Sequence, residues 1–291
     1  MKRKIAVVSL LAALGISTTA FADTFILEGN YLKVGVGSSG ALIDDNFNVG
    51  IDYDKTGNKS WTTYDVLKPG SPWQFYSIGV NGSSAAAGYD LGGNIFGATT
   101  SNTSAGDILS ALTTGRYGDL GFSQSISFSK NSGVIHYAVT LTNTGRSALN
   151  NVAYASGFDP DQDVYAGGNY ETTNTIGTDR VVAYAPVTGW GTAIVGDGTK
   201  SITGWSSNPY YLYNNGTDFN AVGTDYSDDT IAMAWMWSEL GAGESKTIFY
   251  DYALGTDDSG HTDPVPEPST LLLLGGGLLG LGFARKRFAK K

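Results

Sequence analysis

The sequence predicts an all-β protein whose body is an antiparallel β-sandwich. The body is rich in Gly, Ser, Thr, Asn, Tyr and Trp and poor in Leu, Lys and Glu, which disfavours helices and suits strands joined by tight turns. Apolar and polar residues alternate in several short stretches, and turn signals separate these stretches at the spacing of a sandwich. About 240 residues are enough for one large β domain, such as a supersandwich of two sheets, or for two small domains.

The clearest predicted strands are 121–128 and 134–142. Phe122, Ile126 and Phe128 share one side of the first strand, serines line the other side, and the turn at 130–133 makes the pair a hairpin. The Gly/Ser/Ala-rich stretch 81–106 is predicted to form long surface loops. Only 103–113 has a weak helical pattern, and Gly106 argues against it. Further short strands are expected at 25–32, 33–36, 47–53, 73–80, 181–185, 192–195, 201–205, 231–237 and 246–254, with a turn at 240–245 before the last.

The first 22 residues have the pattern of a secretory signal peptide. Residues 2–4 are positively charged, residues 5–16 form an apolar core too short for a transmembrane helix, and Ala20 and Ala22 occupy the positions that signal peptidase reads. Export through the Sec translocon and cleavage after Ala22 are therefore expected, so that the mature chain begins at Asp23.

The C-terminal segment 265–291 has three parts. A Pro-Glu-Pro sequence is followed by the uncharged run 269–284, which as a helix covers roughly 24 Å, and then by a basic cluster. Lys and Arg beside a hydrophobic span stay on the cytoplasmic side, so the body is expected outside the inner membrane. The predicted processing residues are Val265, Pro266, Glu267 and Pro268, and the predicted membrane anchor and basic stop are Leu271, Leu274, Leu278, Leu281, Arg285, Lys286 and Arg287.

This order of Pro-Glu-Pro, apolar helix and basic end resembles the PEP-CTERM sorting signal of Gram-negative bacteria. The resemblance implies recognition by an exosortase, removal of the tail near the Pro-Glu-Pro, and release of the body to the cell surface or beyond. Members of the family tend to come from organisms that make exopolysaccharide and live in biofilms. The alternative is an ordinary membrane anchor, which has no need of Pro-Glu-Pro and usually runs nearer to about 20 residues. The predicted organisation is a signal peptide at 1–22, a body at 23–254, a linker at 255–264 and the sorting signal at 265–291.

The mature body is strongly acidic. Of the 18 basic residues in the chain, three precede Asp23 and five follow Pro268, so the mature part from Asp23 to Pro268, with its linker and Glu267, keeps ten basic against 27 acidic residues and a net charge near −17. Such a surface repels phosphates, so no nucleic acid partner is expected. The chain has no cysteine, so an exported body has to be held by core packing, by a metal, or by both.

The sharpest local signal is the acidic run at 159–163. Carboxylates at alternate positions of a curved segment bring their oxygens onto one hard cation, as many Ca²⁺ loops do. The run is not an EF-hand, because Val164 and Tyr170 stand where that loop needs Gly and Glu. Ca²⁺ is the one cofactor suggested, and a Pro-stiffened acidic turn without a cation or a catalytic carboxylate pair are the alternatives. The candidate ligands are Asp159, Asp161 and Asp163.

Aromatic residues cluster between 189 and 215, with amide side chains among them. Flat aromatic faces beside amides are typical of β-sandwich modules that hold sugars, because the ring stacks on the sugar and the amide bonds its hydroxyls. The alternative is that these aromatic side chains fill the core and the edges of a large sandwich. The candidate sugar-binding residues are Trp190, Trp205, Asn208, Tyr210 and Tyr211.

No catalytic residue is predicted. His136 falls on the outer face of a predicted strand, His261 falls in the linker, and the chain has no nucleophile elbow, metal-binding His pair or phosphate loop. An acidic glycosidase needs only two carboxylates, but their abundance in this chain selects none of them.

Two junctions of the body resemble bacterial immunoglobulin-like and mutarotase-like β-sandwiches. They are the Asn-Thr-Gly turn in 141–152 and the closing hairpin around 240–245. These short patterns support the fold class alone. We therefore expect an exported, exosortase-processed surface or extracellular-matrix protein, structural or adhesive, associated with exopolysaccharide in a biofilm. A carbohydrate-binding module is the first alternative and a polysaccharide-modifying enzyme the second.

Overall fold

The computed structural model describes residues 24–61, 65–70, 72–88, 95, 97–215, 225–258 and 260. The described chain is almost entirely antiparallel β-structure, with one 3₁₀ turn, η1 (Val164–Ala166), and one short helix, α1 (Pro209–Asn215). In this part of the chain no helix is long and apolar enough to cross a membrane. The predicted signal peptide at 1–22 and sorting signal at 265–291 lie outside the described residues.

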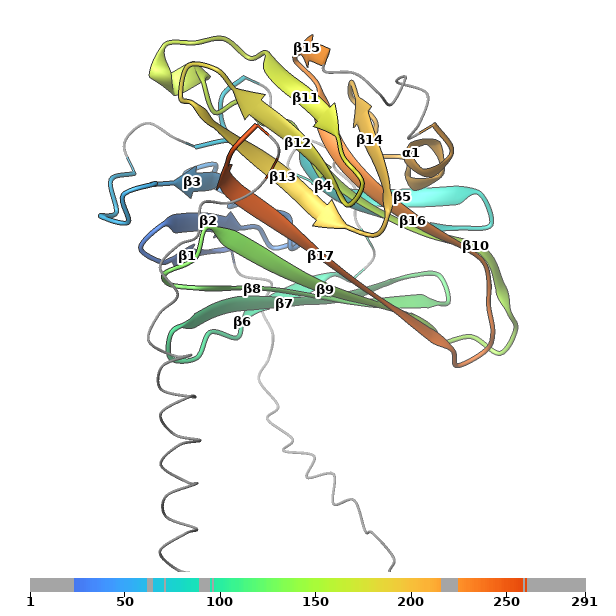
Figure 1. Cartoon of the computed structure of the whole chain (residues 1–291). Helices are drawn as coiled ribbons and strands as arrows, with labels where there is room; N and C mark the ends of the chain where they lie inside the picture. The colour runs from blue at the N-terminus through green and yellow to red at the C-terminus, as the bar shows by residue number, and fades with distance from the viewer. Residues whose placement is uncertain are drawn as a thin grey trace, which may run out of the picture.

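The strands form three sheets (Figure 1). The nine-stranded sheet has the order β15 (Asp225–Ser227), β11 (Thr172–Ile176), β12 (Arg180–Ala185), β13 (Trp190–Gly196), β17 (Ser245–Thr256), β9 (Val134–Asn143), β8 (Leu120–Ser129), β7 (Ile108–Tyr117) and β6 (Thr99–Asn102). The five-stranded sheet has the order β14 (Thr199–Thr203), β16 (Thr230–Leu240), β10 (Leu149–Phe158), β4 (Gln74–Val80) and β5 (Ser83–Gly88). The small sheet consists of β1 (Phe25–Glu28), β2 (Leu32–Val36) and β3 (Ile51–Tyr53).

One hydrophobic core joins the three sheets, and the predicted antiparallel sandwich is confirmed. The core takes Val34 from the small sheet, Ile78 and Met233 from the five-stranded sheet, and Val139 and Ile194 from the nine-stranded sheet. The outer face of the five-stranded sheet is covered as well, because Leu212 of α1 packs on the small side chains of β10 and β16. Both faces of β16 are therefore buried, which explains its nearly continuous apolar sequence.

A layer of tyrosines lies between the two large sheets. Tyr154 of β10 meets Tyr250 of β17 with 2.8 Å between the hydroxyl oxygens, and it also donates to Gln124 Oε1 at 2.9 Å. Ser156 Oγ lies 2.6 Å from the hydroxyl of Tyr252. Burial raises the pKa values of Tyr154 and Tyr250 well above 10, so both hydroxyls stay protonated. These bonds connect strands about a hundred residues apart and fix how the sheets face each other.

The strand predictions were clearest where apolar and polar residues alternate, and strands of small polar residues were missed. The hairpin of β8 and β9 is confirmed, and Ile135, Tyr137 and Val139 point inward as expected. The stretch 81–106, predicted as loops, contains the strands β5 and β6, because Ser and Ala at a sheet edge give no alternation. The weak helical pattern at 103–113 is wrong because β7 occupies 108–117, whereas α1 was not predicted. Strand β17 ends at Thr256, two residues beyond the predicted body.

The strands at the sheet edges are short. The two edges of the nine-stranded sheet, β15 and β6, have three and four residues, whereas its inner strands β17 and β9 have 12 and 10. The edge strands of the small sheet, β1 and β3, have four and three. In the nine-stranded sheet and the small sheet the longest strands therefore lie in the interior.

A buried carboxylate organises the loops beside β3. Asp65 accepts backbone N–H bonds from Gly50 at 2.7 Å, Ile51 at 3.3 Å, Leu67 at 2.9 Å and Lys68 at 3.1 Å. This set of bonds fixes the 65–68 segment against β3.

Asp52 lies beside Asp65 without such a set of donors. Burial raises the pKa of Asp52 to about 7, the negative charge of Asp65 adds to the shift, and Lys33 and Lys68 oppose it. Asp52 therefore keeps its proton at pH values where an exposed aspartate has lost it.

Replacing Tyr154 by Phe is expected to lower the free energy of unfolding by about 1–3 kcal/mol, because the side chains of Gln124 and Tyr250 lose a buried partner. Chemical denaturation at pH 7 measures this loss. Tyr184→Phe, on a half-buried position of β12, serves as the control and should change stability by less than about 0.5 kcal/mol. Equal stability of the two variants would contradict a structural role for the tyrosine layer.

The stability of the protein should depend on the charge of Asp52. In the folded state the pKa of Asp52 is about 7, whereas its ordinary value is 3.8. Protonated Asp52 therefore contributes its full stabilisation below pH 3.8, and this contribution is lost as the pH rises through 7. Asp52→Asn stays neutral at every pH, so its stability relative to the wild type should improve steadily from pH 4 to pH 8 in urea denaturation. The exposed Asp107→Asn is the control. Parallel pH curves for Asp52→Asn and wild type would exclude this effect.

Candidate metal centre

The acidic run begins where β10 ends. Asp159 follows Phe158, and two backbone bonds hold the run against the 65–73 segment. The N–H of Asp159 donates to the Trp73 carbonyl at 2.8 Å, and the N–H of Asp161 donates to the Val66 carbonyl at 2.9 Å. The run is therefore fixed at the end of the five-stranded sheet.

Three carboxylates meet at this place. Asp159, Asp161 and Asp228 each offer one oxygen, and these oxygens lie within 4.8 Å of one another. Asp159 is 5% exposed and Asp161 is 3% exposed, whereas Asp228 is exposed to solvent. The Oδ1 atoms of Asp159 and Asp161 are buried, and neither has a hydrogen-bond partner within the described parts of the chain. Buried polar atoms are almost always partnered, so two such oxygens in one cluster indicate a place where a cation can bind.

The electrostatics of the cluster point the same way. Burial raises the pKa of Asp161 to about 9, and the charges of Asp159 and Asp228 add to the shift. Burial also raises the pKa of Asp159 to about 7, with contributions from Asp228 and Asp229. Without a cation the cluster therefore retains protons near neutral pH. A divalent cation would replace those protons and remove the repulsion.

The donor set fits a hard cation. All three ligands are carboxylates, the chain has no cysteine, and His136 lies away from the cluster in a 2.8 Å contact with Asp251. Three carboxylates supply up to six oxygens when each binds through both, which is within the six to eight that Ca²⁺ takes, and water can complete the shell. Zn²⁺ and copper favour nitrogen and sulfur ligands, which this cluster does not offer.

Asp163, predicted as the third ligand, has another role. Its carboxylate accepts the backbone N–H groups of Val187 at 2.8 Å and Thr188 at 2.7 Å. The chain turns into η1 directly after Asp163, which has helical backbone angles, so its side chain does not continue the alternation of Asp159 and Asp161. The structure places Asp228 in the cluster instead. Sequence reasoning missed Asp228 because it is brought in by the pairing of Phe158 with Ile231 in neighbouring strands.

The predicted sugar-binding residues do not form one site. Asn208 accepts the N–H groups of Tyr210 and Tyr211 and so caps α1, and the Tyr210 hydroxyl donates to the Asn151 carbonyl at 2.6 Å. Tyr211 is 46% exposed on α1. Trp205 is 55% exposed and packs edge-on against Trp73, with ring centroids 5.3 Å apart. Asn208 and Tyr210 thus make hydrogen bonds within the fold. Trp190 packs on Tyr53, whereas Trp205 packs on Trp73.

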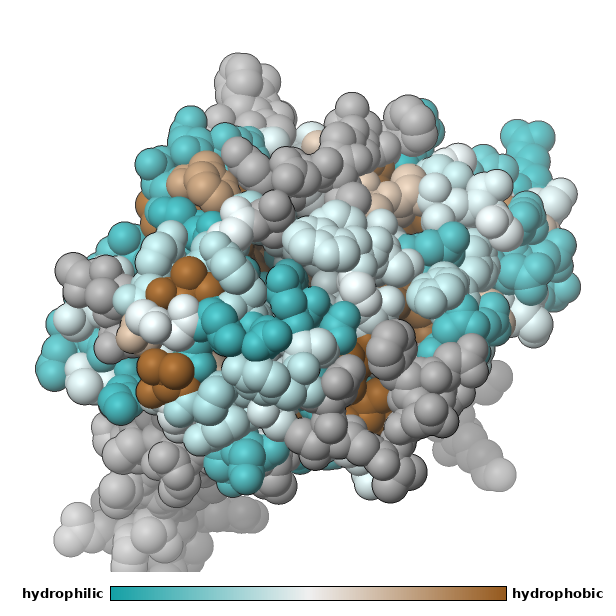
Figure 2. Space-filling view, turned by 90° about the horizontal axis from the view of Figure 1, so that it is seen from above, coloured by the Kyte–Doolittle hydropathy of each residue, from teal (hydrophilic) through white to brown (hydrophobic). Residues whose placement is uncertain are grey.

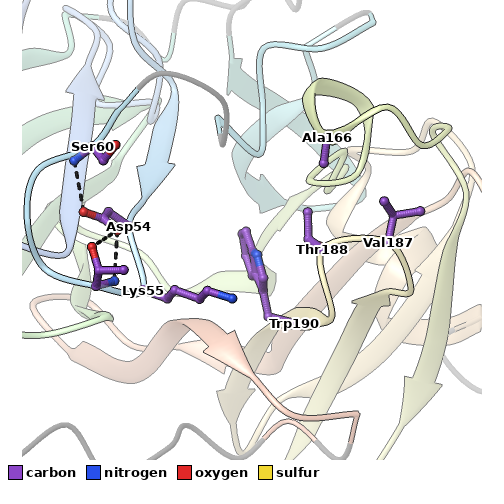
Figure 3. A pocket seen from close by; sticks show the side chains of 8 residues that line it. Asp54, Lys55, Ser60, Ala166, Val187, Thr188 and Trp190 are labelled. Carbon is purple, nitrogen blue, oxygen red and sulfur yellow. Dashed lines mark hydrogen bonds between the residues drawn. The ribbon is translucent and has the colours of Figure 1, made fainter.

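Trp190 borders a cavity of about 400 Å³ (Figure 3). One wall is the 54–60 loop, in which the Asp54 carboxylate accepts N–H bonds from Thr56, Asn58 and Ser60 and a hydroxyl bond from Thr56. Burial tends to raise the pKa of Asp54, but these bonds outweigh it and the pKa is lowered. The opposite wall is formed by Ala166 of η1 and the 187–188 turn that Asp163 holds.

The face of the molecule seen from above in Figure 1 is largely polar where it is coloured in Figure 2. Figure 2 shows hydrophilic side chains over most of the coloured area, with apolar side chains in small separate spots. Within that coloured area, no broad apolar patch interrupts the polar surface. Polar or charged ligands therefore suit this face better than apolar ones.

Solved structures similar to this chain include several β-rich proteins. A TPR-domain containing protein from Parabacteroides distasonis has 12% identity and a TM-score of 0.45, covering 84% of this chain and 48% of that one. A bacterial glucoamylase complexed with acarbose has 11% identity and a TM-score of 0.48, covering 84% and 35%. A galactose mutarotase related enzyme from Lactobacillus acidophilus has 12% identity and a TM-score of 0.41, covering 80% and 98%.

The chain spans less than half the length of the first two of these proteins. Identities this low concern the fold alone. No activity is transferred from any of these proteins to this chain. No curated protein sequence matches the chain.

The C-terminal segment has a clear counterpart among protein families. Residues 264–287 match the family model described as the PEP-CTERM protein-sorting motif. The match contains the predicted Pro-Glu-Pro and the basic cluster 285–287, and it confirms the resemblance expected from the sequence. The motif implies Sec-dependent export, transient anchoring in the membrane by the C-terminus, and sorting by exosortase. The chain is thus a β-sandwich body that carries a PEP-CTERM protein-sorting motif at its C-terminal end.

Proposed function

We propose that the processed protein is a structural or adhesive component of the cell surface or extracellular matrix, associated with exopolysaccharide, and that Ca²⁺ stabilises its body. The cation centre carries the proposal, because two buried carboxylate oxygens without partners need a positive charge to be stable when ionised. An extracellular location favours such a site, since weak Ca²⁺ sites of extracellular modules work at roughly 10⁻⁴ to 10⁻³ M.

The centre would tie together segments distant in the sequence. Asp159 and Asp161 belong to the loop after β10, and Asp228 belongs to the turn between β15 and β16. The loop is also bonded to the 65–73 segment. A bound cation would therefore cross-link two loops, one of which is already bonded to a third segment, at one end of a sandwich that has no disulfides. This is how we account for a stable exported body without cysteine.

Adding CaCl₂ to the chelator-treated mature protein should raise its melting temperature by several degrees. A ligand at 100 times its Kd stabilises by about 2.7 kcal/mol, and each kcal/mol shifts a domain of this size by ~2–4 °C. Asp161→Asn and Asp228→Asn should abolish the rise. Asp161→Asn should also be more stable than wild type in EDTA at pH 8, because the wild-type Asp161 has to take up a proton to be buried, whereas Asn is neutral in the folded and the unfolded state.

The matched control is Asp163→Asn. It should lower the melting temperature, because the N–H groups of Val187 and Thr188 lose their charged acceptor, but it should keep the rise with Ca²⁺. A wild type that does not respond to Ca²⁺, or an Asp228→Asn variant that responds fully, would exclude the centre.

Processing is tested by the intact mass of the protein released from the native organism. We expect a chain that starts at Asp23 and lacks residues 271–291, because exosortase removes the tail near the Pro-Glu-Pro. Changing Pro266, Glu267 and Pro268 together to Ala should leave the full tail and keep the protein in the membrane fraction, whereas Thr262→Ala, outside the matched segment, should be released normally. A released protein that retains 271–291 would rule out this processing.

The proposal treats the body as non-catalytic. The second alternative, a polysaccharide-modifying enzyme, is tested by incubating the mature protein with the organism's own exopolysaccharide and measuring chain length and new reducing ends. Turnover of the polysaccharide would overturn the structural role.

A further inference from the structure

We propose that the cavity beside Trp190 binds an acidic saccharide unit, a sugar that carries a carboxylate. The ligand would come from the exopolysaccharide with which the protein is proposed to associate, so this inference rests on the proposed function. The cavity itself has the size expected for a small-molecule site, about 400 Å³ within the usual ~300–1,000 Å³.

Trp190 supplies the apolar wall that a sugar ring needs. It is 7% exposed, and its ring packs on Tyr53 with centroids 5.0 Å apart and the planes tilted by 57°. This contact fixes the indole from behind, and the rest of the ring borders the cavity (Figure 3). A ring that is already held loses little entropy when a ligand stacks on it.

Lys55 supplies the positive charge. Its side chain extends toward Trp190 across the cavity (Figure 3), and within the described chain its ammonium has no carboxylate partner. Lys59 of the same loop differs, because it pairs with Glu28 at 3.3 Å. The ammonium of Lys55 is therefore available to a carboxylate of the ligand, and such charge-assisted bonds are about twice as strong as neutral ones.

The other polar groups around the cavity do not compete for that ammonium. The Asp54 carboxylate is occupied by four donors from its own loop. Thr188 lines the opposite wall, and its Oγ1 is buried without a hydrogen-bond partner among the described residues. Ser60 lines the cavity as well. The Ser60 hydroxyl can bond a sugar hydroxyl, whereas the Thr188 hydroxyl would become accessible only after its side chain rotates.

The net negative charge of the body does not exclude an acidic ligand. At physiological ionic strength charges are screened over ~8 Å, so the nearest charge decides local binding. Inside this cavity Lys55 provides the positive charge, and the Asp54 carboxylate keeps its negative charge but is bonded to N–H and O–H donors of its own loop. The acidic remainder of the surface repels polyanions, so an acidic ligand is expected to bind at a defined site rather than nonspecifically.

The experiment uses tetragalacturonate as the acidic probe and cellotetraose as the neutral probe, with the mature protein in 150 mM NaCl and Ca²⁺. Calorimetry should show binding of the acidic probe. Lys55→Gln should weaken it about tenfold or more, because a charged hydrogen bond contributes about 1.5–3 kcal/mol. The matched variant Lys59→Gln should bind like wild type. Trp190→Ala should remove binding of both probes, and Trp190→Phe, which keeps an aromatic ring, should restore part of it.

Three outcomes would overturn the proposal. The first is that tetragalacturonate does not bind at millimolar concentration. The second is that both probes bind with equal affinity and Lys55→Gln has no effect. The third is that Trp205→Ala loses binding while Lys55→Gln binds normally. Neither the Ca²⁺ melting experiment nor the mass of the released protein depends on this cavity. If the calorimetry shows no saccharide binding, the proposed extracellular role is unaffected. If the Ca²⁺ melting or mass experiment fails, saccharide binding in the cavity can still be tested separately.

Discussion

The position of the two large sheets depends on hydroxyl groups that are buried between them. A phenol in a dry interior needs a partner, and the bonds of Tyr154 with Tyr250 and of Ser156 with Tyr252 are available at one offset of β10 against β17. A purely apolar interface would tolerate sliding more easily, because hydrophobic contact has no direction. The tyrosine layer thus fixes the position of β10 against β17, and the loop after β10 carries the acidic run.

From that fixed end the loop divides into two halves with different tasks. Asp159 and Asp161 point their unpartnered oxygens into the acidic cluster, whereas Asp163 holds the 187–188 turn through two backbone bonds. The division follows from backbone shape, because an extended segment alternates its side chains and a helical one does not. One short run therefore serves the cation centre on one side and the wall of the Trp190 cavity on the other.

Much of this architecture was predictable from local patterns, and the rest depends on pairing between distant strands. Alternation revealed β8, β9 and β17, and the acidic run was recognised as the main polar feature. Asp228 could not be assigned to the acidic cluster from the sequence. Its position beside Asp159 and Asp161 depends on the register between β10 and β16, which no local pattern encodes. Trp190 and Trp205 look alike in sequence, and only the packing of Tyr53 and Trp73 separates them. β5 was missed because Ala and Ser give no contrast between its two faces.

The short edge strands have a consequence for how this protein can join other molecules. An exposed edge is a template on which another chain can add a strand, and long edges lead to fibres. The nine-stranded sheet ends in strands of three and four residues, so a second copy finds few free backbone groups in register there. Among the described strands, attachment through the nine-stranded sheet has to use side chains rather than backbone. The nine-stranded sheet therefore offers a second copy of the chain little template for extending it strand by strand.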